Sequence, residues 1–407
     1  MLFKEVIGQH EVKQQLIQMV QQNRLSHALL FLGKEGSGAL PLALAFANYV
    51  CLSSYNRAES PASLFDDPSG KSGGSGTPVI NSWQEADNWM QRQPAWSKVS
   101  GMIHPDIHYS YPTVPRKSGD KTVSTDYVSE WRSFIKESPY GNGYDWLQYI
   151  KAENRQGNIT VHECNDIIRK LSLKSFESGF KILVMWLPEF LGGEGNKLLK
   201  IIEEPPENTL FILVAENEHL ILPTILSRTQ LVKVPALEEQ EVEEALVSLK
   251  KISAEQARQI AFITEGNYRE ALLWLQQGDD DWLELLRGWL NPVIKMNPLA
   301  QVKWIEEIAS QGREKQKQFI RYFIQLLEQA IRIHIIGDAT VQLTEPEKDF
   351  VLKFNRFASF DQMEIMITEL NNAIYYIERN ANAKILFHAL TIKLYHIIVK
   401  KEKVELR

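Results

Sequence analysis

Cysteine is scarce in this chain, with only Cys51 and Cys164 among 407 residues. The two do not form a C-x-x-C motif, which argues against both a structural zinc site and a disulfide scaffold, so we expect no bound metal. No apolar run approaches the roughly 18 to 20 residues of a membrane helix, and residues 1–5 (MLFKE) are not a signal-peptide core. We therefore expect a cytoplasmic protein with no membrane partner.

An excess of basic charge is also missing, since 45 Lys and Arg stand against 51 Asp and Glu, a net charge of −6. Phosphate contacts need concentrated Lys and Arg, so this balance argues against a free-standing nucleic-acid binder. It remains compatible with a subunit that meets DNA only inside an assembly. The length of 407 residues predicts two or three domains, and 44% hydrophobic content is typical of a globular protein.

Apolar runs alternate with helical patterns over residues 1–235. Val12, Leu16 and Val20 recur at helical spacing, and Thr160 begins a helix with Glu163 three residues on, as in a capping box. The predicted strands are 27–32, 104–109, 181–187, 209–214 and 231–234. Strands that alternate with helices predict an α/β domain with a mostly parallel sheet covered on both faces.

The regular pattern is interrupted once and then changes character. DDPSGKSGGSGTP (66–78) is a Gly- and Ser-rich stretch, so we predict a flexible insertion at about 53–100. Strand signals stop near residue 236. We predict a small helical lid domain over 236–283 and an all-helical C-terminal domain over 284–407.

The glycine-rich stretch GKEGSGAL (33–40) lies between a predicted strand and a predicted helix, where P-loops bind phosphate. Two of its glycines are five residues apart, as in G-x-x-x-x-G-K-[ST]. Ala39 and Leu40 stand where Lys and Ser/Thr would contact the phosphates and Mg²⁺, and Lys34 is at the wrong end of the loop. The glycines of this degenerate P-loop are Gly33, Gly36 and Gly38. We predict that it binds no nucleotide tightly and needs no cofactor.

A second ATPase element is also altered. An ATPase needs an acidic pair at the end of an apolar strand, yet KILVMWLPEF (181–190) has Trp186 and Leu187 there. Glu189 comes two residues late, and we interpret it as a solvated loop carboxylate. Two independent losses predict that the chain has no ATPase activity of its own.

A third element is intact, and it carries a family resemblance. The segment NKLLKIIEEPPENTLFILVAENEHLILPTILSRTQ (196–230) strongly resembles AAA+ clamp-loader subunits. Combined with the broken P-loop, it looks like the delta-prime subunits of the bacterial DNA polymerase III clamp loader. VIGQHEVKQQL, RLSHALLFLG and HPDIHY are also similar to that family. The resemblance is good over the ordered parts of 1–235, fair over the lid and loose beyond it.

The resemblance implies a fold, a role and a set of partners. The expected fold is an AAA+ P-loop-type α/β domain, and the expected role is that of an accessory subunit of the DNA polymerase III holoenzyme. Ser227 and Arg228 match the family's Ser-Arg-Cys triplet, although Thr229 replaces the Cys. In the family this triplet faces a neighbour's nucleotide, so Arg228 would act in trans as an arginine finger. The implied partners are gamma/tau-like motor subunits, a delta-like subunit, the sliding clamp and primed DNA, and residues 284–407 would form an oligomeric collar.

Two family features are not carried over with the fold. Of the four-cysteine zinc module that members often carry, only Cys51 has a match, so zinc is not implied. Arg269 in GNYREAL resembles a lid arginine that senses phosphate, but an ordinary role on a helix surface is an equal alternative. For the whole chain, two other functions stay open: an ATP-hydrolysing motor subunit, and an AAA+ shell that serves only as a scaffold.

Overall fold

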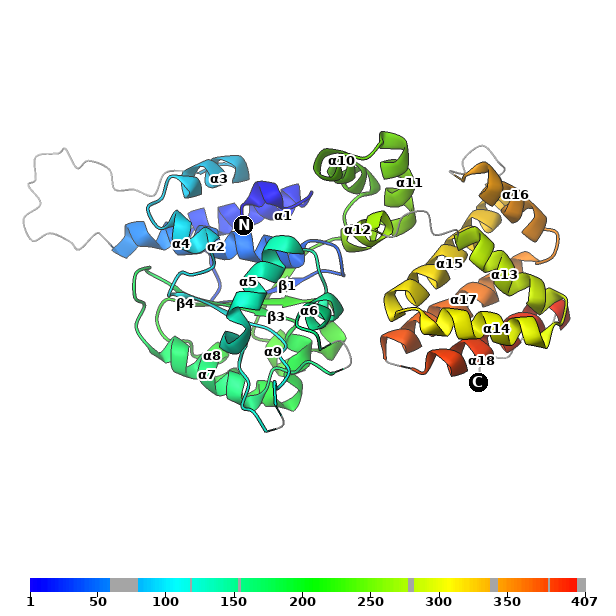
Figure 1. Cartoon of the computed structure of the whole chain (residues 1–407). Helices are drawn as coiled ribbons and strands as arrows, with labels where there is room; N and C mark the ends of the chain where they lie inside the picture. The colour runs from blue at the N-terminus through cyan, green and yellow to red at the C-terminus, as the bar shows by residue number, and fades with distance from the viewer. Residues whose placement is uncertain are drawn as a thin grey trace, which may run out of the picture. The chain divides into compact units, whose positions relative to one another are not determined.

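The computed structural model describes residues 1–58, 80–117, 119–152, 155–276, 282–336, 343–379 and 381–400. The centre of the expected insertion, 59–79, lies outside the described residues. The chain divides into two compact units, Met1–Leu275 and Gln276–Arg407 (Figure 1). Within the described ranges, no helix is both long and apolar enough to cross a membrane.

The first unit contains a five-stranded parallel sheet with the strand order β2-β3-β4-β1-β5. Its strands are β1 (Ala28–Leu32), β2 (Ile107–Ser110), β3 (Lys181–Trp186), β4 (Thr209–Ala215) and β5 (Gln230–Lys233). Every residue of β3 and β4 is buried, as expected for parallel strands with helices on both faces. The predicted α/β fold class is confirmed.

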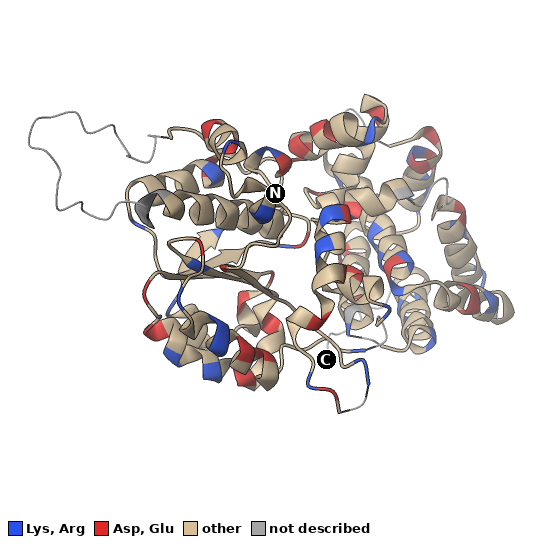
Figure 2. Cartoon of the chain, turned by 60° about the vertical axis from the view of Figure 1, so that its left-hand side comes forward, with Lys and Arg blue, Asp and Glu red and all other residues tan. Residues whose placement is uncertain are grey.

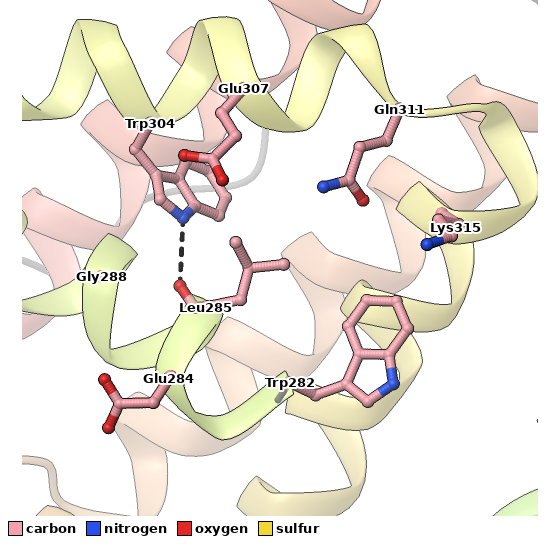
Figure 3. A pocket seen from close by; sticks show the side chains of 8 residues that line it. All are labelled: Trp282, Glu284, Leu285, Gly288, Trp304, Glu307, Gln311 and Lys315. Atoms are coloured by element: carbon pink, nitrogen blue, oxygen red, sulfur yellow. Dashed lines mark hydrogen bonds between the residues drawn. The ribbon is translucent and has the colours of Figure 1, made fainter. Parts of the chain in front are cut away.

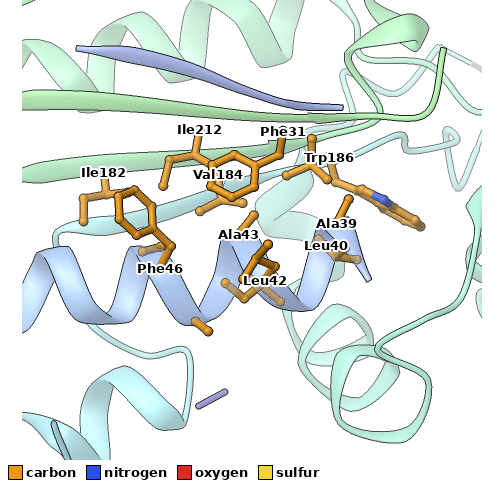
Figure 4. Packing of buried hydrophobic residues seen from close by; sticks show 14 of the residues in the cluster. Phe31, Ala39, Leu40, Leu42, Ala43, Phe46, Ile182, Val184, Trp186 and Ile212 are labelled. Carbon is orange, nitrogen blue, oxygen red and sulfur yellow. The ribbon is translucent and has the colours of Figure 1, made fainter. Parts of the chain in front are cut away.

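Alternating strand side chains build one core on each face of the sheet. Leu29 and Phe31 belong to the core shared with α1 (His10–Gln21) and α2 (Ala39–Ala58). Ala28 and Leu30 belong to the core shared with α7 (Val161–Ser172) and α8 (Leu199–Glu203) (Figure 1). The helix α2 is apolar on nearly every side because it is buried among other elements (Figure 4). The helical segments before the lid are η1 (Phe3–Glu5), α1 (His10–Gln21), α2 (Ala39–Ala58), α3 (Trp83–Gln91), α4 (Trp96–Ser100), η2 (Ser124–Tyr127), α5 (Val128–Glu137), α6 (Gly143–Tyr149), α7 (Val161–Ser172), η3 (Pro188–Leu198), α8 (Leu199–Glu203), η4 (Glu218–Leu220) and α9 (Pro223–Leu226).

Part of the expected flexible insertion is folded, because residues 83–100 contain the helices α3 and α4. Ala86, Met90 and Val99 are fully buried in the first core. The Asp87 carboxylate also accepts the backbone N–H groups of residues 3 and 4, both at 2.8 Å. These helices are therefore part of the folded domain, and their apolar positions outweigh the Gly- and Ser-rich sequence that precedes them.

The start of α7 follows the expected capping, with one difference. Thr160 is the N-cap, and its side chain accepts the N–H of Glu163. The Glu163 carboxylate does not return the bond, because it accepts both the N–H and the hydroxyl of Ser124, each at 2.7 Å. Burial raises the pKa of Glu163.

The lid consists of α10 (Glu239–Lys250), α11 (Ala254–Thr264) and α12 (Tyr268–Gln276), and it belongs to the first unit. Its small core joins Val242, Leu246 and Ile260 to Tyr140 of the α/β part. Gly266 separates α11 from α12 with a φ of +82°, and a Cβ there would lie 2.0 Å from the Leu237 carbonyl oxygen. Only glycine fits at this close approach.

The second unit is all-helical. Its described elements are α13 (Trp282–Ile294), α14 (Pro298–Ser310), α15 (Arg313–Ile336), α16 (Glu345–Phe354), α17 (Phe360–Glu378), α18 (Ala383–Tyr395) and a π-helical turn, His396–Lys400. The buried indole of Trp289 stacks on Trp304 at 4.8 Å and donates to the Thr391 hydroxyl at 2.9 Å. A pocket of about 390 Å³ beside Trp304 is lined by residues of α13, α14 and α15 and by Gln311, which lies between α14 and α15 (Figure 3). Acidic and basic residues are interspersed on the helices of both units (Figure 2).

Candidate functional site

The glycine loop forms a tight connection between β1 and α2. Gly36 and Gly38 have φ values of +75° and +88°, a region that favours glycine. A Cβ on Gly36 would lie 2.0 Å from the Asn267 side-chain oxygen of the lid. The Gly33 N–H donates to the carbonyl of Ala215 at the end of β4, at 3.1 Å. These glycines serve the chain connection and the close approach of the lid.

Apolar side chains occupy the place where a P-loop holds phosphate and magnesium. Ala39 and Leu40 begin α2 and are 8% and 5% exposed, and Trp186 at the end of β3 is 2% exposed (Figure 4). The cavity left over the loop measures about 20 Å³. This space is on the scale of a single water molecule. The residues present therefore do not fit a nucleoside triphosphate with its magnesium ion.

The Trp186 indole is held in place by an aromatic cluster. Its ring lies 5.3 Å from Trp131 and 6.0 Å from Phe134, both on α5. Trp146 on α6 completes the cluster at 5.4 Å from Trp131. The sequence showed that the acidic pair was lost, but α5 and α6 were missed, so the aromatic packing that replaces it was not predicted.

Arg269 of the lid is bound by two carboxylates of the α/β part. Its Nε and Nη2 donate to Asp145 at 2.5 and 2.6 Å, and its Nη1 donates to Glu35 of the glycine loop at 2.8 Å. Asn142 also donates to Glu35, at 2.9 Å. Only 5% of the Arg269 side chain is exposed, so the alternative of a helix-surface role is wrong. The guanidinium has its anionic partners within its own chain.

Glu189 is not the solvated carboxylate that we expected. One of its oxygens accepts the N–H groups of Glu216 and Asn217 at the end of β4, at 2.6 and 2.9 Å. The other oxygen is buried, with no hydrogen-bond partner among the described residues. Burial raises the pKa of this carboxyl. Glu189 therefore fixes the end of β4.

Arg228 lies just after α9, and its guanidinium is oriented by neighbouring groups. Nη1 donates to the Thr224 carbonyl at 2.7 Å and to the Ser227 hydroxyl at 3.2 Å. The Ser227 hydroxyl in turn donates to the same carbonyl at 3.2 Å. Nε and Nη2 contact the carboxylate of Glu203, at the end of α8. The Arg228 side chain is 32% exposed.

Arg228 and the glycine loop lie near opposite ends of the parallel strands. In a parallel sheet the carboxyl ends of all strands lie on the same side, and the glycine loop follows the carboxyl end of β1. Arg228 precedes β5, whose first residue Gln230 pairs with Leu29 near the amino end of β1. A five-residue strand spans about 16 Å. Arg228 therefore lies remote from its own chain's glycine loop.

The two cysteines belong to separate cores on opposite faces of the sheet. Cys51 lies 3.7 Å from His104 Nδ1, and burial raises its pKa to about 12. Over the described residues there is no cluster of three or more His, Cys, Asp or Glu that could hold a metal ion.

The parallel sheet, the glycine loop after β1 and the helical lid define an AAA+-type α/β protein. A model of the family described as DNA polymerase III, delta subunit, matches residues 8–63 and 84–238. The chain belongs to this family, and it is a delta-prime-like clamp-loader subunit. The matched residues include the site residues predicted from the sequence, from Gly33 to Arg228.

The chain is also similar to individual proteins. The chain is 24% identical over 265 residues to DNA polymerase III subunit delta' of Bacillus subtilis, covering 65% of this chain and 58% of the relative. It is 31% identical over 126 residues to subunit tau of the same organism, covering 30% and 22%. The matches thus span less than two thirds of these relatives' lengths. A gamma subunit-related protein of Thermotoga maritima shares 15% identity, with a TM-score of 0.36, over 94% of this chain and 99% of that one.

Proposed function

We propose that this chain is a non-hydrolysing subunit of a replicative clamp loader that supplies Arg228 to the ATP site of a neighbouring subunit. It would help load the sliding clamp onto primed DNA. Its assembly partners would be gamma/tau-like motor subunits and a delta-like subunit, in the cytoplasm. Residues 284–407 would join the oligomeric collar.

The observation that carries this proposal is the contrast between the two ends of the parallel strands. At the carboxyl ends, Ala39, Leu40 and Trp186 leave about 20 Å³ where a nucleotide would lie. At the amino ends, Arg228 is partly exposed and oriented by Thr224 and Ser227. Arg228 is remote from the glycine loop of its own chain, so a nucleotide phosphate that it contacts would belong to a neighbouring subunit.

A planar guanidinium suits this role for physical reasons. It can bind two oxygens of a γ-phosphate at once and offset the charge that develops in the transition state. Arginine fingers contribute about 10³- to 10⁵-fold in rate in other nucleotide hydrolases. Lysine cannot reproduce the two-pronged geometry.

The test is a complex reconstituted with Arg228→Ala. We expect a folded, assembled complex in which turnover at the site beside this subunit falls by about 10³-fold or more. Because the other sites continue to turn over, clamp loading onto primed DNA is the more sensitive measurement. Arg228→Lys should restore only part of the activity.

Arg258→Ala is the matched control, since Arg258 lies on the lid with 61% of its side chain exposed. It should load clamps normally. Normal loading by an assembled Arg228→Ala complex would refute the trans-acting role and favour the scaffold alternative. ATP hydrolysis by the isolated chain would favour the motor alternative.

A further inference from the structure

Each of the three nitrogens of the Arg228 guanidinium contacts a group of its own chain, although the side chain remains 32% exposed. Nη1 faces the Thr224 carbonyl and the Ser227 hydroxyl, and Nε and Nη2 face the Glu203 carboxylate. Arginine binds planar oxyanions through two parallel N–H groups. The Nε–Nη2 edge has that geometry, and Glu203 covers it.

Glu203 belongs to the Glu203-Glu204-Pro205-Pro206 motif, and only one of its two carboxylates contacts the arginine. Glu203 ends α8 and reaches Arg228, 25 residues later in the chain. The Glu204 side chain is exposed and makes no hydrogen bond or ion pair with any residue that the structure describes. The motif thus contains a functional candidate and an adjacent matched control.

We propose that Glu203 is a latch on Arg228, which the γ-phosphate of a neighbour's ATP must displace before the arginine can act. This inference rests on the proposed trans-acting role of Arg228. While Glu203 holds the Nε–Nη2 edge, the finger is neutralised. A γ-phosphate offers more negative charge and more acceptor oxygens than a carboxylate, so it can take over this edge.

The surroundings make this exchange feasible. The Arg228 and Glu203 side chains are 32% and 42% exposed, so water can solvate the carboxylate when the arginine leaves it. Ion pairs of this kind are weak. The contacts of Nη1 with Thr224 and Ser227 do not involve Glu203, so they can keep the guanidinium oriented during the exchange.

The latch has a specific kinetic consequence. The free-energy cost of displacing Glu203 is the same in the ATP complex and in the transition state, because Arg228 contacts the γ-phosphate in each of them. Such a uniform term changes KM and leaves kcat unchanged. ADP has no γ-phosphate, so the latch should not affect its binding.

The experiment compares Glu203→Gln with Glu204→Gln in the reconstituted complex. For Glu203→Gln we expect the KM for ATP at the adjacent site to fall about two- to fivefold, with kcat and ADP inhibition unchanged. In a plot of ATPase rate against ATP concentration, the affected site should then appear as a separate component that saturates at lower ATP than the other sites. Glu204→Gln removes the same charge one residue away and should leave all three quantities unchanged.

The Arg228→Ala background separates the two proposals. There Glu203→Gln should have no effect on KM, because the latch has nothing to hold. If Arg228→Ala lowers turnover but Glu203→Gln leaves KM unchanged or lowers kcat, the latch is refuted and the arginine finger stands. If Arg228→Ala has no effect, the proposed function itself fails. Glu203→Ala with a normal melting temperature serves as a second variant in case glutamine still binds the arginine.

Discussion

Arg269 and Arg228 both contact carboxylates of their own chain, but their surroundings differ. Arg269 is 5% exposed and is held by Glu35 and Asp145, whereas Arg228 is 32% exposed and is held by Glu203. Burying a guanidinium is costly unless hydrogen-bonded anions compensate for it. At Arg269 the protein supplies these anions permanently. At Arg228 one carboxylate contacts a guanidinium that stays partly exposed to water.

This difference bears on how the lid is attached to the α/β part. In active relatives, the family resemblance implies that the lid arginine lies near a phosphate of the nucleotide. Here Glu35 and Asp145 provide negative charge at Arg269, and Asn267 of the lid packs against Gly36. These side chains therefore help to hold the lid against the α/β part. Arg228, by contrast, is 32% exposed.

The largest expected effect comes from removing the buried arginine. Arg269→Ala leaves Glu35 and Asp145 close together and mostly buried, so the free energy of unfolding should fall by about 4 kcal/mol. Urea denaturation of the isolated chain measures this. The exposed lid control Arg258→Ala should change stability by less than about 0.5 kcal/mol. A loss below about 1 kcal/mol for Arg269→Ala would show that the cluster does not hold the lid.

Restoring the P-loop motif should also be costly. Ala39→Lys combined with Leu40→Thr places an ammonium and a hydroxyl where the wild-type side chains are 8% and 5% exposed. We expect a loss of about 3 kcal/mol and no ATP binding by calorimetry, because Trp186 still fills the site. Lys34→Ala, at an exposed position of the same loop, is the control. Tight ATP binding by the double variant would mean that the site can still open.

Much of the fold could be predicted from the sequence, for identifiable reasons. The strands β1, β3 and β4 are buried on both faces, so they are continuous apolar runs. The helices α5 and α6 were missed because they lie within a polar, glycine-containing stretch. Residues 83–100 were assigned to a flexible insertion because the glycines before them dominated the local composition.

The candidate site was predicted only in part. Ala39, Leu40 and Trp186 could be interpreted directly, since each replaces a residue with a known chemical task. The partners of the arginines could not: Asp145 is 124 residues from Arg269, and no local pattern connects them. Glu203 stood in a recognised motif, but its contact with Arg228 depends on how α8 and α9 pack.

Lys13, another buried cation, shows why Arg269 needs carboxylates. Lys13 is 1% exposed, donates to the Val6 carbonyl at 2.6 Å, and lies 4.8 Å from the Trp83 ring centre. Burial lowers its pKa from 10.5 to about 8. Lysine can thus shed its proton when buried, whereas arginine stays charged and must be neutralised.

The pH dependence of stability follows from that shift. Between about pH 8 and the unfolded pKa of 10.5, the native state binds fewer protons at Lys13 than the unfolded state, so stability rises with pH. Relative to Lys13→Met, the wild type should gain about 2 kcal/mol from pH 7.5 to pH 9.5. Denaturation midpoints of both proteins across this range provide the measurement. Parallel curves for the two would show that Lys13 does not titrate there.

The smallest expected effect is on the stability of Arg228→Ala, and it completes the comparison with Arg269→Ala. The Arg228–Glu203 pair is partly exposed, and such pairs contribute roughly 0 to 1 kcal/mol. Without Arg228, water can solvate the Glu203 carboxylate, so the free energy of unfolding should change by no more than about 0.5 kcal/mol. Urea denaturation under the conditions used for Arg269→Ala measures this. A loss above about 1.5 kcal/mol would assign Arg228 a structural role, and a clamp-loading defect in that variant could then come from misfolding rather than from a missing contact with phosphate.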